Sequence, residues 1–124
     1  VTSRQSAQAD VGFVMWPSSV VLARYLAQNS SILEAKRVLE LGSGCGLVGL
    51  SAAMIRQQQS QDVQSPVILT DFNPTVLENL GRSIRLNNLL ADECIVKGLD
   101  FYDPSGNTNG WTDINGILQD PVDL

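Results

Sequence analysis

The sequence predicts an α/β domain built on a parallel sheet, and two features of the chain carry this prediction. Short apolar runs alternate with longer segments whose apolar residues recur at helical spacing, so strands and helices are expected to alternate along the chain. The apolar runs are continuous, as in strands that are buried on both faces and pair in parallel through right-handed crossovers. A length of 124 residues suffices for one small domain with a single core.

The first helix is expected to follow residues 12–19. This segment, "GFVMWPSS", is expected to be extended or turning, because Pro17 disfavours the helical region for the residue before it. Ser18 or Ser19 is predicted to cap the helix, and Asn29 to end it. The predicted apolar face consists of Val21, Leu22, Tyr25 and Leu26.

A strand, a helix and a second strand come next. "RVLEL" (37–41) is short and apolar, which favours a buried parallel strand, and "VILTD" (67–71) has the same character. The segment 46–58 between them is predicted to be a helix, and the Gln-rich segment 57–66 a polar loop. The helix is predicted to pack on the sheet through Leu47, Leu50, Met54 and Ile55.

The third helix carries the clearest start signal. Asn73 is a suitable N-cap, and Pro74 fits the first helical position, where its missing N–H costs nothing. The helix is predicted to end at Asn87 and Asn88. Its apolar stripe is predicted to contain Val76, Leu77, Leu80 and Ile84.

The remaining segments set the expected domain boundaries. A third strand is predicted at 94–99 and a polar loop at 100–113, and a fourth strand is expected to begin at Val122. Residues 1–11 are polar and unpatterned, so we expect a flexible N-terminal arm. Residues 12–124 are then the N-terminal part of a domain that stops at the start of its fourth strand.

Composition excludes several classes of function. The net charge of −5 argues against binding to a nucleic acid backbone and favours a cationic ligand or partner. The absence of histidine excludes histidine-based catalysis and histidine metal sites within this chain. Cys45 and Cys94 match no metal-binding spacing, so free thiols in a reducing compartment are expected. No apolar run approaches the ~20 residues of a membrane span, and we expect no membrane partner.

A cluster of glycines directly follows the first strand, in "VLELGSGCGLVGL" (38–50). Glycines in a strand–loop–helix turn permit tight backbone geometry and leave room for a ligand. A phosphate-binding P-loop is excluded, because no Lys followed by Ser or Thr comes after the glycines. A dinucleotide fingerprint fits Gly44, Gly46 and Gly49, but this frame leaves Gly42 without a role. The frame that starts where the strand ends is Gly42, Gly44 and Gly46.

Two carboxylates indicate the ligand of this loop. Glu40 lies within the apolar first strand, and burying its charge is costly without a cationic or hydrogen-donating partner. Asp71 ends the second strand, where an acidic side chain can accept the hydroxyls of a ribose. NAD enzymes use the same device, so Asp71 alone does not discriminate. Both carboxylates together predict an adenosine with a cationic tail, which is S-adenosylmethionine.

These residues belong to a wider resemblance. The stretches "VMWPSSVVLARYL", "RVLELGSGCGLVGLSAA" and "VILTDFNPTVLENL", followed by "IRLNN" and "KGLDF", make the chain similar to the seven-β-strand S-adenosylmethionine-dependent methyltransferases. Within that class the sequence resembles methyltransferase family 16, the lysine methyltransferase-like branch. The resemblance implies a Rossmann-like, doubly wound parallel sheet, of which this chain holds about the first half.

The resemblance also implies a cofactor site. Glu40 and the glycines would line the methionine end, Asp71 would hold the ribose, and Asp100 and Phe101 would hold the adenine. Phe101 stands where the family usually has Trp, and Trp16 matches a tryptophan near the cofactor. The complete implied set for S-adenosyl-L-methionine is Trp16, Glu40, Gly42, Ser43, Gly44, Gly46, Asp71, Phe72, Asn73, Asp100 and Phe101.

The implied activity is methyl transfer to a lysine side chain of a protein substrate by in-line displacement, with no metal. No catalytic residue is assigned, and the 124 residues alone are expected to be inactive or dependent on a partner. The expected location is the cytoplasm, with the nucleus as a second compartment. A NAD-dependent oxidoreductase domain and a non-catalytic nucleoside-binding or interaction module are the alternatives.

Structural interpretations compete with these assignments. Glu40 could pair with Lys36 or Arg37, and Asp71 could merely begin the following helix. Trp16 and Phe101 could pack in the core instead of contacting a cofactor.

Overall fold

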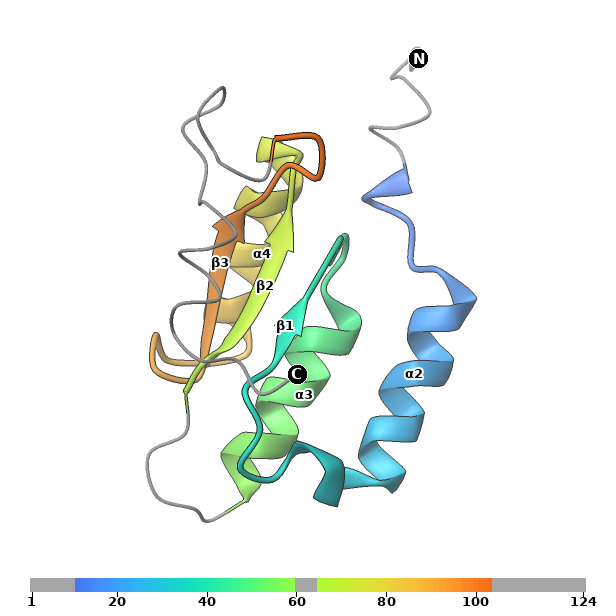
Figure 1. Ribbon diagram of the computed structural model, residues 1–124, viewed down its shortest axis with the longest axis vertical. Helices are drawn as coiled ribbons and strands as arrows, with labels where there is room; N and C mark the ends of the chain where they lie inside the picture. Colours follow the sequence, from blue (N-terminus) through green and yellow to red (C-terminus); the bar gives the residue numbers. More distant parts are fainter. Residues whose placement is uncertain (1–10, 60–64, 104–124) are drawn as a thin grey trace.

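The computed structural model describes residues 11–59 and 65–103. Helices and strands alternate along this part of the chain, as predicted (Figure 1). The elements in order are α2 (Pro17–Gln28), the short 3-10 helix η1 (Ser30–Leu33), β1 (Leu39–Glu40), α3 (Leu47–Gln58), β2 (Val67–Asp71), α4 (Pro74–Leu86) and β3 (Cys94–Gly98). Of the arm predicted at 1–11, only residue 11 belongs to the described part of the chain. The strand predicted to begin at Val122 lies outside the described residues.

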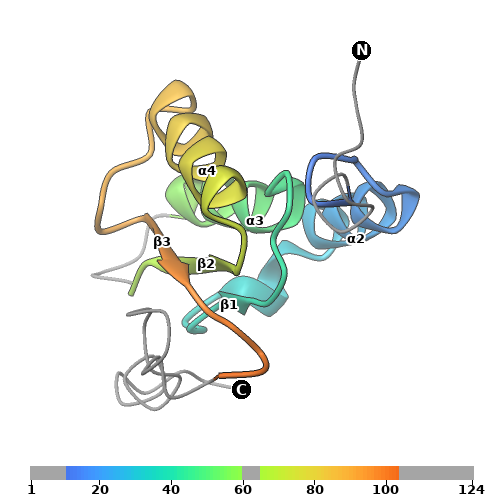
Figure 2. The same ribbon diagram turned by 90° about the horizontal axis from the view of Figure 1, so that it is seen from above.

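The described strands form one sheet in the order β1-β2-β3, and both pairings are parallel. Leu39 pairs with Ile68 on β2, and Ile68 pairs with Ile95 on β3. The central strand β2 is buried along its whole length, because it has a neighbour on each side. Helices α3 and α4 lie on the same side of the sheet, with α2 beside α3 (Figure 2). The predicted α/β class with parallel pairing is confirmed, and the described part is a partial Rossmann-like fold.

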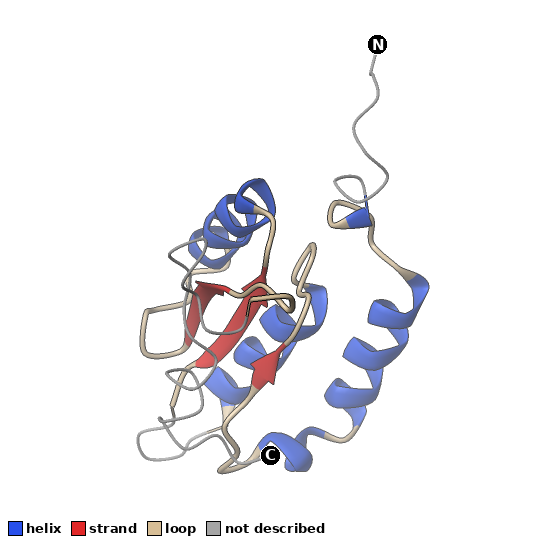
Figure 3. Ribbon diagram, turned by 45° about the horizontal axis from the view of Figure 1, so that its top comes forward, coloured by secondary structure: helices blue, strands red, loops and turns tan. Residues whose placement is uncertain are grey.

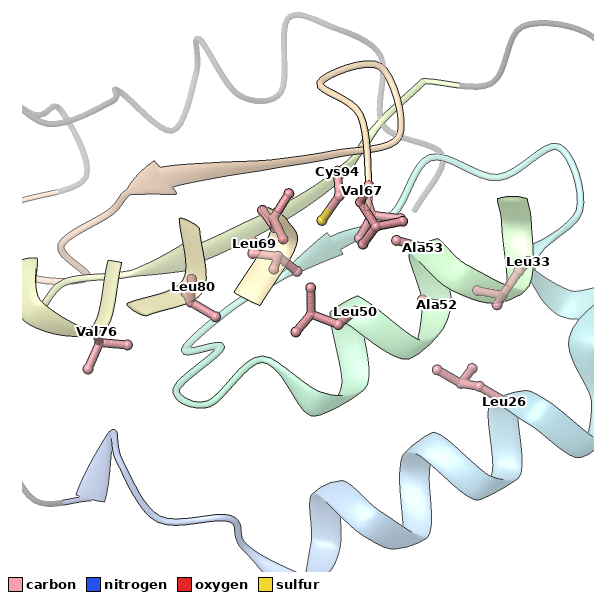
Figure 4. Packing of buried hydrophobic residues seen from close by; sticks show 12 residues of the cluster. Leu26, Leu33, Leu50, Ala52, Ala53, Val67, Leu69, Val76, Leu80 and Cys94 are labelled. Carbon is pink, nitrogen blue, oxygen red and sulfur yellow. The ribbon is translucent and has the colours of Figure 1, made fainter. Parts of the chain in front are cut away.

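The core lies between the sheet and these helices. Successive side chains of a strand point to opposite faces, so Val67 and Leu69 of β2 face α3 and α4, where they pack with Leu50 and Leu80 (Figure 4). Ile68 faces the opposite side, where it forms a smaller apolar cluster with Leu99, Leu39 and Ile95. By the same alternation, Asp71 shares the helix-facing side with Leu69.

The first strand is shorter and less buried than predicted. Regular pairing covers Leu39–Glu40 instead of 37–41, and Leu41 is exposed. The reason is that Ser43 takes over the pairing with the neighbouring strand: its N–H donates to the Thr70 carbonyl at 2.7 Å, and its hydroxyl accepts from the Thr70 N–H at 3.1 Å. The strand can therefore end early without leaving the buried backbone of Thr70 unsatisfied.

The predicted start of the first helix, with Ser18 or Ser19 as its cap, is wrong by two or three residues. Helix α2 begins at Pro17, and Trp16 occupies the N-cap position without capping through its side chain. Ser19 does not cap the helix, because its hydroxyl donates to the Trp16 carbonyl at 2.6 Å. Asn29 ends the helix as predicted. The predicted apolar face is only partly buried: Leu26 is covered, whereas Val21, Leu22 and Tyr25 are exposed.

The buried face of α3 also differs from the prediction. Leu50 is buried as expected, but Met54 is exposed, and two alanines contribute instead. Figure 4 shows Leu26 of α2 on the side of α3 that is away from the sheet. The helix is thus covered on two sides, and the small side chains of Ala52 and Ala53 permit both approaches.

Helix α4 agrees closely with its prediction. The Asn73 side chain accepts hydrogen bonds from the N–H groups of Thr75 (2.9 Å) and Val76 (3.4 Å), so it is the predicted N-cap. Of the predicted stripe, Leu77 is partly buried and the other members are fully buried. The helix ends at Asn87. Among the described residues, no helix combines the length and apolar character that crossing a membrane requires.

Candidate functional site

A cavity of about 760 Å³ lies at the carboxyl ends of the strands. The three strands point toward the same side of the molecule, where loops follow them (Figure 3). The cavity is lined by the loops after β1, β2 and β3 and by the segment 11–22, which contains the start of α2. Open α/β sheets bind ligands at this edge, because the loops after parallel strands converge there.

Every residue of the predicted cofactor site lines this one cavity. Four segments that are distant in the sequence contribute: the turn before α2, the end of β1 with the glycine loop, the end of β2, and the loop after β3. The structure therefore brings the whole predicted set together. These residues are Trp16, Glu40, Gly42, Ser43, Gly44, Gly46, Asp71, Phe72, Asn73, Asp100 and Phe101.

Sequence reasoning missed several lining residues. Ser18 and Ser19 were interpreted as helix caps, although they lie in the first turn of α2 at the cavity. Leu99 and Tyr102 also line the cavity, on either side of the predicted pair Asp100 and Phe101 in the sequence. Their position next to this pair is the sequence feature that could have predicted them. Leu22 was assigned to the buried face of a helix, but it is exposed and lines the cavity.

The glycines of the loop serve different purposes. Gly42 has φ +63°, and a Cβ atom there would meet no other atom within 4 Å, so its backbone borders open space. Gly46 has φ +81°, and a Cβ atom there would lie 2.5 Å from Leu80 Cδ2 of α4. Gly42 thus supplies backbone at the cavity, whereas Gly46 permits close packing beneath it.

Glu40 turns toward the helices, and its carboxylate is held by protein donors. Its Oε2 atom accepts from the Gly49 N–H at 3.2 Å, and the Ser43 side chain also hydrogen-bonds to it. Burial raises the pKa of the Glu40 carboxyl, and these two hydrogen bonds oppose that shift. Glu40 forms no ion pair within residues 11–59 and 65–103, so the interpretation that it pairs with Lys36 or Arg37 is wrong for this part of the chain.

The position of the Glu40 carboxylate requires a glycine at position 49. A Cβ atom at Gly49 would overlap Leu69 Cδ2 and Glu40 Oε2. Glycine at this position therefore lets α3 approach β2 closely and lets Glu40 reach the first turn of the helix. Packing explains Gly46 and Gly49 of this frame, and the positive φ of +52° together with the nearby Gly12 carbonyl explains Gly44, without a dinucleotide.

Asp71 connects the end of β2 to the glycine loop. Its Oδ2 atom accepts from the Gly44 N–H at 3.0 Å, and its Oδ1 atom accepts from the N–H groups of Phe72 (2.8 Å) and Asn73 (3.1 Å). The side chain is buried but still reaches the cavity. Asp71 therefore does form the turn before α4, as the structural interpretation held, and it also fixes the loop. Oδ1 already accepts two hydrogen bonds, whereas Oδ2 accepts one and has a second lone pair with which it can accept from a ligand.

Aromatic side chains surround the opening of the cavity. Trp16 is 50% exposed, and Phe101 is 64% exposed, so core packing is excluded for both. Phe72 and Tyr102 are exposed at the same cavity. The backbone N–H of Tyr102 donates to Asp100 Oδ1 at 2.9 Å, which shapes the turn after β3. Exposed rings at a cavity offer flat apolar surfaces on which a base can stack.

The charge of the cavity has one sign. Its described lining includes the carboxylates of Glu40, Asp71 and Asp100 and contains no Lys, Arg or His. Such a lining favours a cationic ligand and disfavours a pyrophosphate. Nowhere within residues 11–59 and 65–103 do three or more His, Cys, Asp or Glu side chains form a group that could hold a metal ion.

Comparison with known proteins identifies the family. Residues 1–114 match the model of methyltransferase family 16, described as lysine methyltransferase. The chain belongs to this family. The family membership agrees with the resemblance on which the cofactor-site prediction was based, while the roles of the individual residues remain predictions.

The names of similar proteins give either lysine or arginine as the residue that accepts the methyl group. Calmodulin-lysine N-methyltransferase of Arabidopsis thaliana is 34% identical over 70% of this chain and 27% of its own length. The human protein-lysine N-methyltransferase EEF2KMT is 33% identical over 72% of this chain and 25% of its own. Histone-arginine methyltransferase METTL23 of Xenopus laevis is 38% identical over 73% of this chain and 36% of its own. The chain thus spans about a quarter to a third of these relatives.

Proposed function

We propose that the chain is the cofactor-binding part of an S-adenosylmethionine-dependent methyltransferase that acts on a protein lysine. One observation carries the proposal: in a member of this family, a glycine loop and three carboxylates line a single cavity at the carboxyl ends of parallel strands, and its described lining contains no Lys, Arg or His. An adenosine with a positively charged tail matches such a cavity in size and charge.

The residues present fit this cofactor. A volume of about 760 Å³ lies within the usual range for small-molecule sites, and the backbone at Gly42 borders open space. Asp71 would hold the ribose hydroxyls, Glu40 and the loop would hold the methionine end, and Asp100 with Phe101 would hold the adenine. When bound, S-adenosylmethionine supplies a methyl group on a sulfonium.

The contribution of the chain is binding and orientation. The carboxylate of Asp71 is fixed by three backbone N–H groups, so it needs little rearrangement to accept a ligand. Apolar side chains of the lining, such as Val14, Leu22 and Leu99, would limit the hydration of an amine bound against them. A weakly hydrated environment lowers the pKa of an incoming amine and thereby favours its reactive neutral form.

The first test is binding of S-adenosylmethionine to the full-length protein by calorimetry. We expect saturable binding of S-adenosylmethionine and none of NADH, because a pyrophosphate would meet three carboxylates and no cation. Asp71→Asn should weaken S-adenosylmethionine binding by roughly 10- to 100-fold, the size expected when a charge-assisted hydrogen bond is lost. Asp92→Asn is the matched control, since Asp92 is exposed and does not line the cavity. Unchanged affinity in Asp71→Asn would contradict the ribose assignment.

The acceptor is proposed to be lysine because the family description and several relatives name lysine. The test is transfer of labelled methyl groups into cell-extract proteins by the full-length enzyme, followed by hydrolysis and amino-acid analysis. We expect methyllysine, and less label with Asp71→Asn at cofactor concentrations that do not saturate the weakened site. Methylarginine alone would contradict the lysine proposal and would match the acceptor named for the Xenopus relative.

We also propose a cytoplasmic location with a nuclear fraction, as expected for an enzyme with protein substrates and free thiols. Fluorescence microscopy of the tagged full-length protein would test it, and signal confined to a secretory compartment would contradict it.

A further inference from the structure

Glu40 is a carboxylate that the described fold provides with hydrogen-bond donors but not with a cation. Its donors are the Gly49 N–H and the Ser43 side chain, and both are neutral. The single hydroxyl hydrogen of Ser43 is donated to Glu40, while its oxygen accepts from the Thr70 N–H. The carboxylate therefore lies in the cavity wall with its charge uncompensated.

The described elements around Glu40 also contribute no positive charge to compensate its carboxylate. Neither an acidic nor a basic side chain lies in the first turn of α3 (47–49). From β2 the cavity receives Asp71, and from the segment after β3 it receives Asp100 and Tyr102. In β3, the pKa of Cys94 is raised to about 12, mainly by burial and further by the charge of Glu40. These neighbours are negative or neutral, so none favours ionisation of Glu40.

We propose that Glu40 couples binding of a cationic ligand to the release of a proton. The unoccupied cavity disfavours the charged carboxylate, and a ligand with a positive tail supplies the missing countercharge and favours it. This inference rests on the proposed function, because it takes the ligand to be S-adenosylmethionine. It goes beyond that function by making the affinity for the cofactor depend on pH through one named residue.

The raised pKa that burial gives to Glu40 sets the direction of the effect. Below this pKa in the free protein, the bound state carries fewer protons than the free state, so the affinity rises with pH by up to tenfold per unit. Above it, Glu40 is ionised in both states and the affinity becomes constant. The α-amino group of the ligand titrates near pH 8, so measurements in the acidic range, more than a unit below that pH, avoid its titration.

The experiment is calorimetry of the full-length protein with S-adenosylmethionine across this pH range, in pairs of buffers that differ in ionisation enthalpy. We expect the affinity to rise with pH and the heat to depend on the buffer, which reports proton release. Methylthioadenosine, which lacks the charged tail, is the matched ligand control and should bind without proton release.

Two variants test whether Glu40 is the group that releases the proton. Glu40→Gln should remove the proton release and leave the melting temperature unchanged or higher, because the buried charge is gone. Ser43→Ala, which removes a donor to the ionised carboxylate, should move the pH dependence to higher pH. If Glu40→Gln failed to fold, the direction of the Ser43→Ala shift would still decide.

Several outcomes would overturn the inference. These are pH-independent binding in the unaltered protein, the same proton release with methylthioadenosine or in Glu40→Gln, and an unshifted pH dependence in Ser43→Ala. Absence of S-adenosylmethionine binding at every pH is a different result, because it would refute the proposed function itself.

Discussion

At the scale of single residues, the glycines after β1 differ in what they permit. Gly42 provides backbone that borders the cavity, whereas Gly46 and Gly49 provide space for neighbouring side chains. The requirement at Gly49 is strict, because a side chain there would overlap both a core leucine and the Glu40 carboxylate. A run of glycines that looks like one ligand-binding motif thus combines binding and packing.

Gly49→Ala is therefore expected to lower the free energy of unfolding by about 1–3 kcal/mol, as overpacking in a core does. Thermal or urea unfolding of the full-length protein would measure the loss. Gly81→Ala is the matched control: Gly81 lies within α4, and a new Cβ atom there would lie 3.7 Å from Arg85 Nη1, at ordinary van der Waals distance. This variant should be stabilised by about 0.5–1 kcal/mol, the usual difference between the two residues inside a helix. Equal effects at both positions would contradict the packing role of Gly49.

At the scale of elements, α4 forms where local signals and tertiary packing agree. Asn73 caps its first turn, Pro74 occupies the first helical position, and the apolar stripe faces β2. Helix α2 shows the opposite case, since no side chain caps it and only Leu26 of its predicted face is buried. Its position depends on contact with α3 more than on its own sequence.

Asn73→Ala should destabilise the protein by about 1 kcal/mol, because the N–H groups of Thr75 and Val76 would lose their acceptor. Chemical unfolding of the full-length protein would measure this difference. Asn79→Ala, in the interior of the same helix, is the control and should be neutral or stabilising, since alanine is the better helix former. A loss of stability in Asn79→Ala equal to that in Asn73→Ala would show that capping is not the cause.

At the scale of the whole molecule, the candidate site exists only because four separate segments meet at one edge of the sheet. Asp71 connects two of them through its hydrogen bond to the Gly44 N–H. Gly12 brings in a third, because its carbonyl lies 3.7 Å from the Cys45 sulfur and borders Gly44. Glu40, Asp71 and Asp100 lie at the same edge of the sheet and line the cavity. Part of the acidic charge of this chain, whose net charge is −5, is therefore concentrated in the cavity lining.

The sequence by itself determined the α/β class, the middle strand and the start of α4, and it predicted residues that the structure brings to one cavity. It could do so because these features depend on local patterns and on one general rule, that the ends of parallel strands lie at a common edge. Asp71 ends a predicted strand, and its position predicted that it would lie at this edge. Phe101 was assigned to the same site through the family resemblance, and the two residues line one cavity.

Only the tertiary structure decided which side chains are buried and which donors they meet. Met54 and Tyr25 occupy helix faces that looked apolar, but both side chains remain exposed in the fold. Glu40 was expected to need a donor, and the Gly49 N–H became that donor because α3 packs within reach of β1. Burial and hydrogen-bond partners are properties of segments brought together by the fold, so no local pattern in the sequence can specify them.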